Sequence, residues 1–322
     1  MKVVVVGGSG FIGTRLLTEL QERGHEVANV DLVPSAAHPA VTALGDVRDE
    51  AAMTAALAGA DAVVNLAAEH RDDVRPLSRY ASTNVDGARA LAAAASAAGV
   101  PRVLFTSTVA VYGLGRPRPT EDDPTLPFNE YGRTKLAAEE VLRGWAAQDP
   151  ARSLFVVRPC VVFGEGNRGN VWTLATQVAS GRFLMIGDGS NRKSMAYVGN
   201  VAAFLAGGLD AGPGTHLTNY ADRPDLTTRQ LTDLLQDELG VTSRRRPLPV
   251  RAGLVAGAAA DVVARVTRRP LPVSRVRVEK FVAETTVGTA RLEASGFAPP
   301  YALEDALRRT VRAEFPERVR PA

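Results

Sequence analysis

Three side chains in the middle of the chain have the types and the spacing of an acid–base site. In the sequence YGRTK, Tyr131 and Lys135 are four residues apart, so they lie on one face of the expected helix. An ammonium near a phenol lowers the pKa of the phenol, and a phenolate is a base toward a hydroxyl group. The preceding sequence FTSTVAVYG, residues 105–113, offers hydroxyls that include Thr108 and contains no carboxylate. An ordinary amphipathic helix is the alternative, and the glycine turn described next favours the site.

A glycine-rich turn near the N-terminus has the spacing of a dinucleotide-binding loop. The sequence GGSGFIG places Gly7, Gly10 and Gly13 between an expected strand, 3–6, and an expected helix, 11–22. Gly7 permits the tight turn, Gly10 lets a pyrophosphate approach the helix N-terminus, and Gly13 lets the helix pack closely on the sheet. A tight turn followed by a simple helix cap is the alternative, and the strand–turn–helix context favours the cofactor.

The acid after the second expected strand indicates which dinucleotide binds. Asp31 closes strand 26–30, where a carboxylate hydrogen-bonds the ribose hydroxyls of adenosine. The next residues, LVPSAAHPA, contain no Arg or Lys to meet a 2′-phosphate, so we expect NAD rather than NADP. Asp46 stands where an adenine contact would fall, and its alternative role is to cap the helix that starts near Asp49.

The elements that must position these residues alternate between strand and helix in the first half of the chain. Strands are expected at 3–6, 26–30, 62–66, 103–106 and 154–157, and helices at 11–22, 51–57, 84–98 and 130–147. This alternation predicts an α/β fold with a Rossmann-type, doubly wound parallel sheet. We expect residues 1–165 to form an NAD-binding domain to which 194–220 return. Residues 166–193 and 221–322 would form a smaller C-terminal substrate-binding lobe.

Composition excludes several classes of protein. The chain has 322 residues, 45% hydrophobic and 23% charged, which is enough to bury a large core. No apolar run is long enough to span a bilayer. The single cysteine, Cys160, is expected to be buried and cannot form an intramolecular disulfide. We therefore expect a cytoplasmic protein, and we predict no metal site.

Positive charge is concentrated in one segment. Residues 244–280 carry ten basic residues against Asp261 and Glu279, in a chain whose net charge is only +3. The arginines lack interleaved aromatic residues, so we expect no nucleic-acid partner. Apolar residues recur in this segment at every fourth position: Leu254, Ala258, Val262 and Val266. This stripe predicts a helix that either packs into the core or rests on an anionic membrane through residues 244–280.

The combination of motifs resembles the extended short-chain dehydrogenase/reductase family, which includes NAD-dependent sugar epimerases and dehydratases. The matching segments are GGSGFIG, LAA at 66–68, TNVDG at 83–87, FTSTVAVYG, YGRTK and RPCVVFG at 158–164. The resemblance implies a Rossmann fold and catalytic roles for Thr108, Tyr131 and Lys135. It implies NAD contacts at Gly7, Gly10, Phe11, Ile12, Gly13, Asp31, Asp46, Val47, Leu66, Ala67, Ala68, Asn84, Tyr131, Lys135, Pro159 and Val161.

The two residues that directly follow Thr108 distinguish the different activities within this family. The dehydratases that the chain resembles carry Asp and Glu there, and the decarboxylating members carry Glu at the second position. This chain has Val109 and Ala110, so elimination lacks its proton donor and its base. The resemblance therefore implies a sugar 4-epimerase that works through a 4-keto intermediate. The alternatives are a net NAD-dependent alcohol dehydrogenase or reductase, similar to hydroxysteroid dehydrogenases, and a dinucleotide sensor, which the intact Tyr131 disfavours.

Further segments resemble the epimerases of bacterial surface-polysaccharide synthesis, such as O-antigen synthesis. These segments are LAAEHRDDV, FNEYGRTK, FGEGNRGNV and NRKSMAYVGNVAAF. The subgroup implies an N-acetylhexosamine substrate on a polyprenyl-diphosphate or UDP carrier, acted on at the inner face of the plasma membrane, and a homodimer through helices 84–98 and 130–147. It implies substrate contacts at His70, Arg71, Thr108, Asn170, Arg192 and Lys193. A structural role for His70 and a solvated loop at Arg168 are the alternatives.

Overall fold

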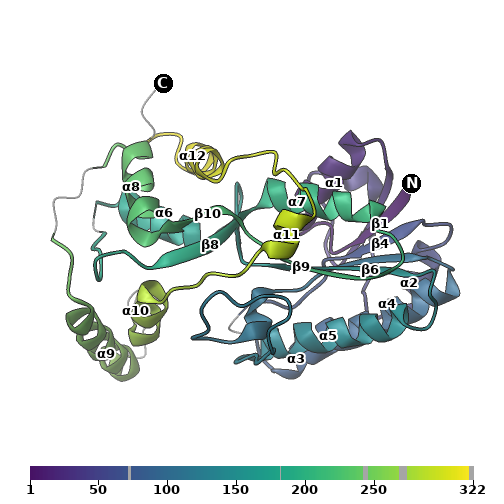
Figure 1. The fold of residues 1–322 in the computed structure, drawn as a ribbon, viewed down its shortest axis with the longest axis horizontal. Helices are drawn as coiled ribbons and strands as arrows, with labels where there is room; N and C mark the ends of the chain where they lie inside the picture. The colour runs from purple at the N-terminus through teal and green to yellow at the C-terminus, as the bar shows by residue number, and fades with distance from the viewer. Residues whose placement is uncertain (72–73, 182, 242–245, 268–273, 319–322) are drawn as a thin grey trace. The chain divides into compact units, whose positions relative to one another are not determined.

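A seven-stranded parallel sheet is the centre of the fold (Figure 1). The computed structural model describes residues 1–71, 74–181, 183–241, 246–267 and 274–318. The strands are β1 (Lys2–Val6), β2 (Glu26–Asp31), β3 (Thr42–Leu44), β4 (Ala62–Asn65), β5 (Arg102–Thr106), β6 (Ser153–Pro159) and β9 (Gly214–Tyr220). They are ordered β3-β2-β1-β4-β5-β6-β9, and each pair runs parallel. The order reverses direction at β1, which confirms the doubly wound Rossmann-type sheet.

Helices cover both faces of this sheet. One face carries α1 (Phe11–Glu22) and α7 (Val198–Gly207), and the other carries α2 (Glu50–Ala56), α4 (Gly87–Ala97) and α5 (Glu130–Ala146). Successive residues of β1 enter opposite cores, with Val3 in one and Val4 in the other. A strand that is buried on both faces explains the unbroken run VVVV, because no position of it meets water.

The chain divides into two compact units. The first comprises Met1–Val162, Ala196–Asp222 and Val287–Tyr301, and the second comprises Phe163–Met195, Arg223–Thr286 and Ala302–Ala322. The return of 287–301 to the first unit was not predicted from the sequence. This stretch contains α11 (Ala290–Ala294) and places Phe297 edge-on to Phe204 of α7, with ring centroids 5.1 Å apart.

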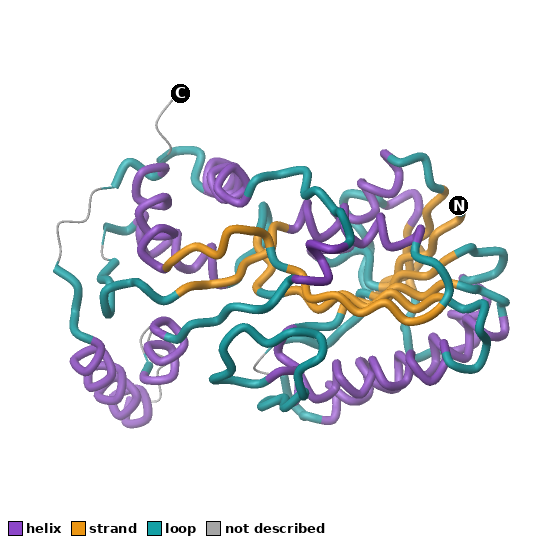
Figure 2. Tube along the Cα trace, viewed as in Figure 1, coloured by secondary structure: helices purple, strands orange, loops and turns teal. Residues whose placement is uncertain are grey.

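The remaining elements are a small sheet and several helices joined by long loops (Figure 2). A three-stranded sheet is ordered β10-β8-β7, with β7 at Val161–Phe163, β8 at Arg192–Tyr197 and β10 at Asp222–Thr227. The helices are α6 (Asn170–Ala179), α8 (Thr228–Glu238), α9 (Val250–Thr267), α10 (Arg275–Val282) and α12 (Leu303–Glu314). Helix α8 packs against α6 and α12, and α9 packs against α10.

The segment before α4 differs from the single helix predicted over 84–98. A short helix, α3 (Ser78–Ala81), continues into a π-helical turn, η2 (Ser82–Asp86), before α4 begins. Two 3₁₀ turns, η1 (Pro39–Val41) and η4 (Gly208–Asp210), connect other elements, and a third, η3 (Val109–Tyr112), follows β5. The π turn widens the helix at Asn84, and such turns are frequent at functional sites.

Candidate active site

The predicted site residues of the first unit follow the carboxyl ends of neighbouring parallel strands. Gly7 follows β1, Leu66 follows β4 and Thr108 follows β5 by two residues. The amide of Leu66 donates to the carbonyl of Val6 at 2.8 Å, so the ends of β1 and β4 stay in register. Because the strands are parallel, these ends lie on one edge of the sheet, where open α/β folds bind their ligands.

The glycine turn fits a pyrophosphate. Gly7 has φ +85°, and a Cβ there would lie 2.6 Å from the amide nitrogen of Ala67, so both conformation and space require glycine. A Cβ on Gly13 would lie 2.5 Å from the Cα of Gly8, which explains the close packing at the helix start. Gly10 precedes α1 and is exposed, and within the described chain no side chain caps this helix. Its first amides, which include those of Phe11 and Ile12, are free for an anion.

Asp31 is fixed at the end of β2 by two backbone amides. Its carboxylate accepts from the amide of Ser9 at 2.9 Å and from the amide of Val33 at 3.2 Å. Each oxygen keeps a lone pair for a ribose hydroxyl. This geometry links the phosphate turn to the second strand and fits the predicted adenosine contact.

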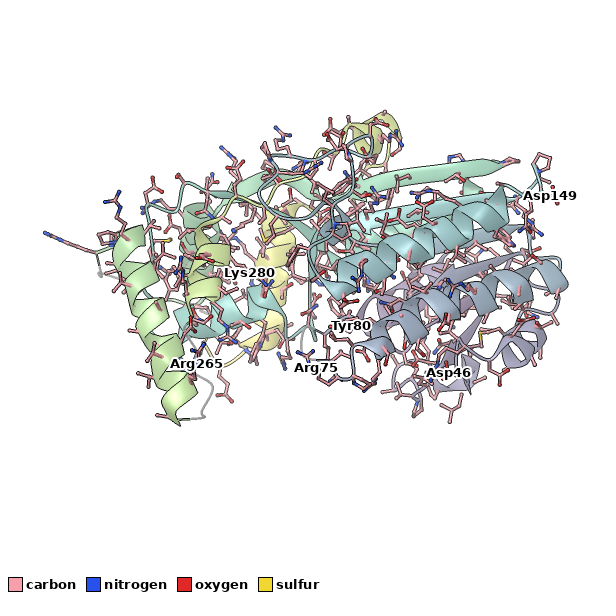
Figure 3. All side chains as sticks on the ribbon, turned by 90° about the horizontal axis from the view of Figure 1, so that it is seen from below. Asp46, Arg75, Tyr80, Asp149, Arg265 and Lys280 are labelled. Atoms are coloured by element: carbon pink, nitrogen blue, oxygen red, sulfur yellow. The ribbon has the colours of Figure 1, made fainter. Side chains whose placement is uncertain are left out.

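Asp46 does not cap the following helix. Asp49 caps α2 instead, accepting from the amide of Ala52 at 2.9 Å. The Asp46 carboxylate is bound by the guanidinium of Arg48, with Nε at 2.9 Å from Oδ1, and this bond lowers the pKa of Asp46. The position of Asp46 is labelled in Figure 3. Its neighbour Val47 is buried, and the adenine contacts of both residues remain predictions.

Asn84 braces the site. Its carbonyl accepts from the amide of Glu69 at 2.8 Å, and its amide group donates to the Glu69 carbonyl at 3.1 Å and to Thr134 Oγ1 at 2.9 Å. Both N–H donors are therefore used, so a cofactor contact by donation from this side chain is not supported. The bonds hold the half-buried loop of Leu66, Ala67 and Ala68 against α5.

The candidate catalytic side chains meet because α5 approaches η3 closely. A Cβ on Gly132 would lie 2.7 Å from the carbonyl oxygen of Ala110, so only glycine allows this approach. Thr108 begins η3, where its hydroxyl accepts from the amide of Ala110 at 3.1 Å. Thr108 lies close enough to Tyr131 to lower the pKa of its phenol. Lys135 follows Tyr131 by one helical turn, as predicted.

Burial dominates the electrostatics of this site. It raises the pKa of Tyr131 to about 12, and the Thr108 side chain offsets part of that rise. It lowers the pKa of Lys135 to about 7, and the carboxylate of Glu139 acts in the opposite direction. The predicted lowering of the tyrosine pKa by Lys135 is therefore wrong for the protein alone, because desolvation penalises both charged forms.

The ammonium of Lys135 fits a bound ribose. The side chain is 1% exposed, and Nζ lies 4.1 Å from the centroid of the Phe105 ring. Among the described residues, no side chain or carbonyl accepts a hydrogen bond from Nζ. A buried ammonium needs acceptors, and the ribose hydroxyls of a dinucleotide would supply them.

The segment after β6 carries the last predicted cofactor contacts. Pro159 ends β6 and is buried, while Val161 begins β7 and is 40% exposed. Cys160 between them is buried, as expected, and its amide donates to the carbonyl of Tyr220 at 3.0 Å. That Pro159 and Val161 border the nicotinamide remains a prediction.

His70 and Arg71, the predicted substrate contacts of the first unit, are exposed. The Nε of Arg71 lies 3.9 Å from the Glu69 carboxylate, and its carbonyl accepts from the Tyr80 hydroxyl. These contacts hold the main chain at this point and leave the His70 ring in solvent. The following residues 72 and 73 of the segment LAAEHRDDV lie outside the described residues.

Lys193, a predicted diphosphate contact, is half-buried and bonds to backbone carbonyls. Its Nζ donates to the carbonyl of Lys280 at 3.0 Å and to that of Ala283, and burial lowers its pKa to about 8. The side chain ties β8 to the end of α10 through two of its three N–H donors, and substrate binding by Lys193 remains a prediction. These carbonyls could not be foreseen from the sequence, because they lie 87 and 90 residues further along the chain.

Asn170 and Arg192 remain accessible in the second unit. Asn170 is the exposed first residue of α6, and Arg192 is exposed while its Nη1 donates to the carbonyl of Asp225 at 3.0 Å. Arg168 forms an ion pair with Glu314 and stacks on Trp172, so it is not a free loop cation. Substrate binding by Asn170 and Arg192 remains a prediction.

Sequence reasoning missed two polar residues that shape the site. Asn29, buried within β2, accepts from the amide of Gly8 at 2.9 Å and so fixes the phosphate turn. Glu139, one helical turn after Lys135, is also fully buried. Asn29 could have been identified as a polar residue inside an apolar strand. Glu139 could have been identified because it follows Lys135 by four residues in the same helix.

Solved structures with this fold cover almost the whole chain. MoeE5 in complex with UDP-glucose and NAD superimposes with a TM-score of 0.78 at 24% identity, covering 98% of this chain and 99% of that one. The UDP-glucose 4-epimerase of Thermotoga maritima with UDP-glucose gives 0.76 at 24% identity, covering 97% and 98%. These likenesses show the fold.

Sequence comparison extends the likeness to relatives with named activities. The N-acetyl-alpha-D-glucosaminyl-diphospho-ditrans,octacis-undecaprenol 4-epimerase of Escherichia coli O157:H7 is 46% identical, covering 97% of this chain and 95% of the relative. The 2-alkyl-3-oxoalkanoate reductase of Stenotrophomonas maltophilia is 31% identical, covering 96% and 98%. The model of the NAD dependent epimerase/dehydratase family matches residues 3–217. With its glycine turn, Asp31 and the Thr108–Tyr131–Lys135 group in place, the chain belongs to the NAD dependent epimerase/dehydratase family.

Proposed function

We propose that this protein is an NAD-dependent sugar 4-epimerase that interconverts gluco and galacto N-acetylhexosamine on a diphosphate carrier. The observation that carries this function is that Thr108 lies close enough to Tyr131 to affect its pKa, beside the acid-free positions Val109 and Ala110. Among the described residues, no carboxylate hydrogen-bonds to either hydroxyl. The site can therefore move a proton but cannot assist the loss of water. The 46% identity to the E. coli epimerase supports the same reaction.

The chain's own residues account for the proton transfers. Tyr131, as a phenolate, takes the proton of the sugar 4-hydroxyl while Thr108 hydrogen-bonds the same oxygen. NAD, the cofactor of this family, supplies when bound a hydride acceptor that can return the hydride, and a positive ring that opposes the high pKa of Tyr131. Lys135 holds the ribose. After the 4-keto sugar presents its other face, Tyr131 returns the proton and the opposite configuration results.

We further propose that the carrier of the sugar is polyprenyl diphosphate. The name of the E. coli relative supports a sugar joined through diphosphate to undecaprenol, and UDP is the alternative carrier. Incubation with GlcNAc-diphospho-polyprenol and with UDP-GlcNAc, side by side, should give the galacto product fastest from the lipid-linked sugar. Conversion of UDP-GlcNAc alone would overturn the lipid carrier and leave the epimerase function intact.

A net alcohol dehydrogenase is the second candidate, favoured by the 31% identity to the Stenotrophomonas reductase. The two activities differ in what happens to the hydride. An epimerase returns it to the same carbon, so turnover should need no added NAD and should release no free NADH. Stoichiometric NADH in solution, without an inverted sugar, would overturn the epimerase.

A membrane contact through residues 244–280 follows from a lipid-linked substrate. The stripe predicted on α9 is not its buried side: Leu254 and Ala258 are half-buried and Val262 is 61% exposed. The buried side is formed by Gly253 and Gly257, where a Cβ would meet Ile186 at 2.7 Å and Arg275 at 2.8 Å. The side chain of Val266 and residues 244–245 and 268–273 lie outside the described residues.

The exposed face of α9 is apolar and has basic neighbours. Val255 is 69% exposed and Val263 is 48% exposed, and with Val262 they recur at helical spacing. Arg265 on α9 and Lys280 on α10, both labelled in Figure 3, are exposed. Apolar residues beside cations suit the interface of an anionic bilayer. Among the described residues, no helix is long and apolar enough to cross a membrane. The proposed contact is therefore peripheral, at the inner face of the plasma membrane.

Vesicle sedimentation tests this contact. The protein should bind phosphatidylglycerol vesicles at low salt and should bind phosphatidylcholine vesicles weakly. Val262→Asp should reduce binding at least tenfold, because it places a charge on the apolar face. Leu44→Asp, which changes an equally exposed apolar residue of the first unit, should leave binding unchanged. Equal binding by both variants would overturn the α9 surface.

A further inference from the structure

A buried carboxylate one helical turn beyond Lys135 has no role in the proton transfers described above. Glu139 lies four residues after Lys135 on α5, and its side chain is 0% exposed. Residues at this spacing share one face of a helix. A carboxylate removed from water is costly unless other groups compensate it, so its surroundings indicate what it does.

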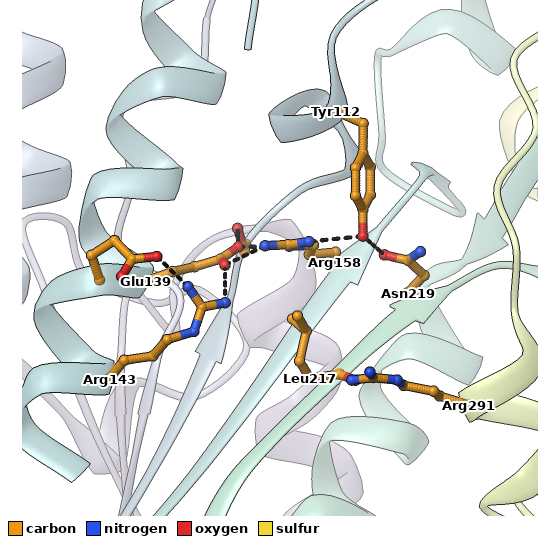
Figure 4. Close-up of polar contacts among 9 residues, drawn as sticks. Tyr112, Glu139, Arg143, Arg158, Leu217, Asn219 and Arg291 are labelled. Carbon is orange, nitrogen blue, oxygen red and sulfur yellow. Dashed lines mark hydrogen bonds and ion pairs between the residues drawn. The ribbon is translucent and has the colours of Figure 1, made fainter. Parts of the chain in front are cut away.

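Donors from three directions fix the Glu139 carboxylate (Figure 4). Oε1 accepts from Arg158 Nε at 2.9 Å and from the hydroxyl of Ser107, the residue before Thr108. Oε2 accepts from Arg158 Nη2 at 2.6 Å and from Arg143 Nη2 at 2.7 Å. With four donors bound, the carboxylate cannot turn away from its place beside Lys135.

The partner guanidinium is anchored as firmly. Arg158 is 2% exposed, and its Nη1 donates to the Tyr112 hydroxyl at 2.7 Å. That hydroxyl donates to Asn219 Oδ1 at 2.7 Å, at the end of β9 (Figure 4). The chain of bonds connects α5, β6 and β9, so the negative charge of Glu139 stays at a fixed point.

Few charged or titratable groups face Lys135. On α5 these are Tyr131 one turn before it and Glu139 one turn after it. Strand β5 places the Phe105 ring against its Nζ, and Arg158 of β6 pairs with Glu139. No ion pair joins Lys135 to Glu139 among the described residues. The carboxylate therefore acts on the ammonium through space and leaves the N–H groups free for a ligand.

We propose that Glu139 is a positioning residue whose buried carboxylate is the counter-charge that keeps Lys135 an ammonium. Arg158 and Arg143 offset part of this field while they hold the carboxylate in place. Burial by itself favours the neutral amine, and Glu139 raises the pKa of Lys135 against that effect. The importance of Lys135 for turnover rests on the proposed function, whereas its charge state is measured without substrate.

The lysine content of the chain allows a direct measurement. The sequence has four lysines, Lys2, Lys135, Lys193 and Lys280, so ¹³C-labelled lysine gives four side-chain signals, and Lys135→Arg identifies one of them. Glu139→Gln in the NAD-bound protein should lower the pKa of Lys135 by about one unit or more, a tenfold change in its proton affinity. Glu140→Gln is the matched control, because Glu140 is the adjacent, exposed carboxylate that also pairs with Arg143. It should leave the pKa of Lys135 unchanged.

Cofactor affinity gives a second readout. Between pH 6 and pH 8, the dissociation constant for NAD should rise more steeply in Glu139→Gln than in the wild type. Glu139→Asp keeps the negative charge and should restore most of the affinity. The same Lys135 titration in Glu139→Gln and Glu140→Gln would overturn the inference. If Glu139→Gln fails to fold, a wild-type Lys135 that titrates well below pH 6 would overturn it instead. Loss of epimerase activity with the expected titration would count against the function and not against Glu139.

Discussion

At the scale of single residues, the site depends on two groups that burial makes hard to charge. Tyr131 resists losing its proton and Lys135 resists keeping one, since burial disfavours the charged form of each. Thr108 and Glu139 each oppose one of these effects. The positions of Tyr131, Lys135 and Thr108 were predictable from the motif, whereas their pKa values depend on packing that no short motif encodes.

Tyr131→Phe removes the proposed base and keeps the ring. We expect epimerisation to fall by about 10²–10⁴-fold, the usual contribution of a general base. Tightly bound NAD should remain in the purified variant, because its predicted phosphate and ribose contacts are the glycine turn, Asp31 and Lys135. Sugar inversion followed by NMR measures the first effect, and cofactor released on denaturation measures the second. An active variant would assign the base to another residue.

Lys135→Met should lower the activity and raise the stability of the protein. The pKa of Lys135 is lowered from 10.5 to about 7 in the fold, so the folded state binds fewer protons than the unfolded chain between these values. Stability of the wild type therefore rises with pH across this window. Replacing the amine by an apolar side chain should raise the free energy of unfolding at pH 7 by up to ~4 kcal/mol, and by only about 1 kcal/mol at pH 10. Urea unfolding at the two pH values checks the difference; an equal gain at both would contradict the lowered pKa.

At the scale of elements, the approach of α5 to η3 decides whether the catalytic side chains meet. Gly132→Ala places a Cβ against the carbonyl of Ala110 and should push the two elements apart. A displacement of about 1 Å at a catalytic group costs on the order of 10²-fold in rate, and we expect a loss of this size in kcat. Gly144→Ala is the matched control on the same helix. Nothing lies within 4 Å of its new Cβ, so it should add up to ~1 kcal/mol of stability with full activity. Equal activities would show that the close approach is dispensable.

The elements that the sequence predicted well are those with a strong pattern. Helix α1 has the predicted bounds, and β2 ends at Asp31, because apolar spacing and a glycine turn determine both. Strand β10 was missed, since Asp222 and Pro224 are unusual in strands and are accepted here at the edge of a small sheet. The π turn at Asn84 was missed because the bonds of this side chain to a distant loop and helix leave no local sequence pattern.

At the scale of the whole molecule, the family resemblance predicts a homodimer through α4 and α5. Nothing in a single chain tests this state, so it stays a prediction. Light scattering should give twice the 34.1 kDa of one chain. Arg133→Glu together with Arg89→Glu, which reverse exposed charges on these two helices, should shift the mass toward one chain. A mass of 34.1 kDa for the wild type at micromolar concentration would contradict the dimer.

Residues 287–301 complete the first unit after the chain has already left it twice. The polypeptide passes between its two units five times, at residues 162, 195, 222, 286 and 301. A fragment ending at residue 222 would keep every strand of the large sheet and would still uncover the aromatic rings of Phe204 and Tyr220, which Phe297 covers. The first unit is therefore complete only once residues 287–301 have joined it, so a nascent chain that stops before them would expose these aromatic rings to water.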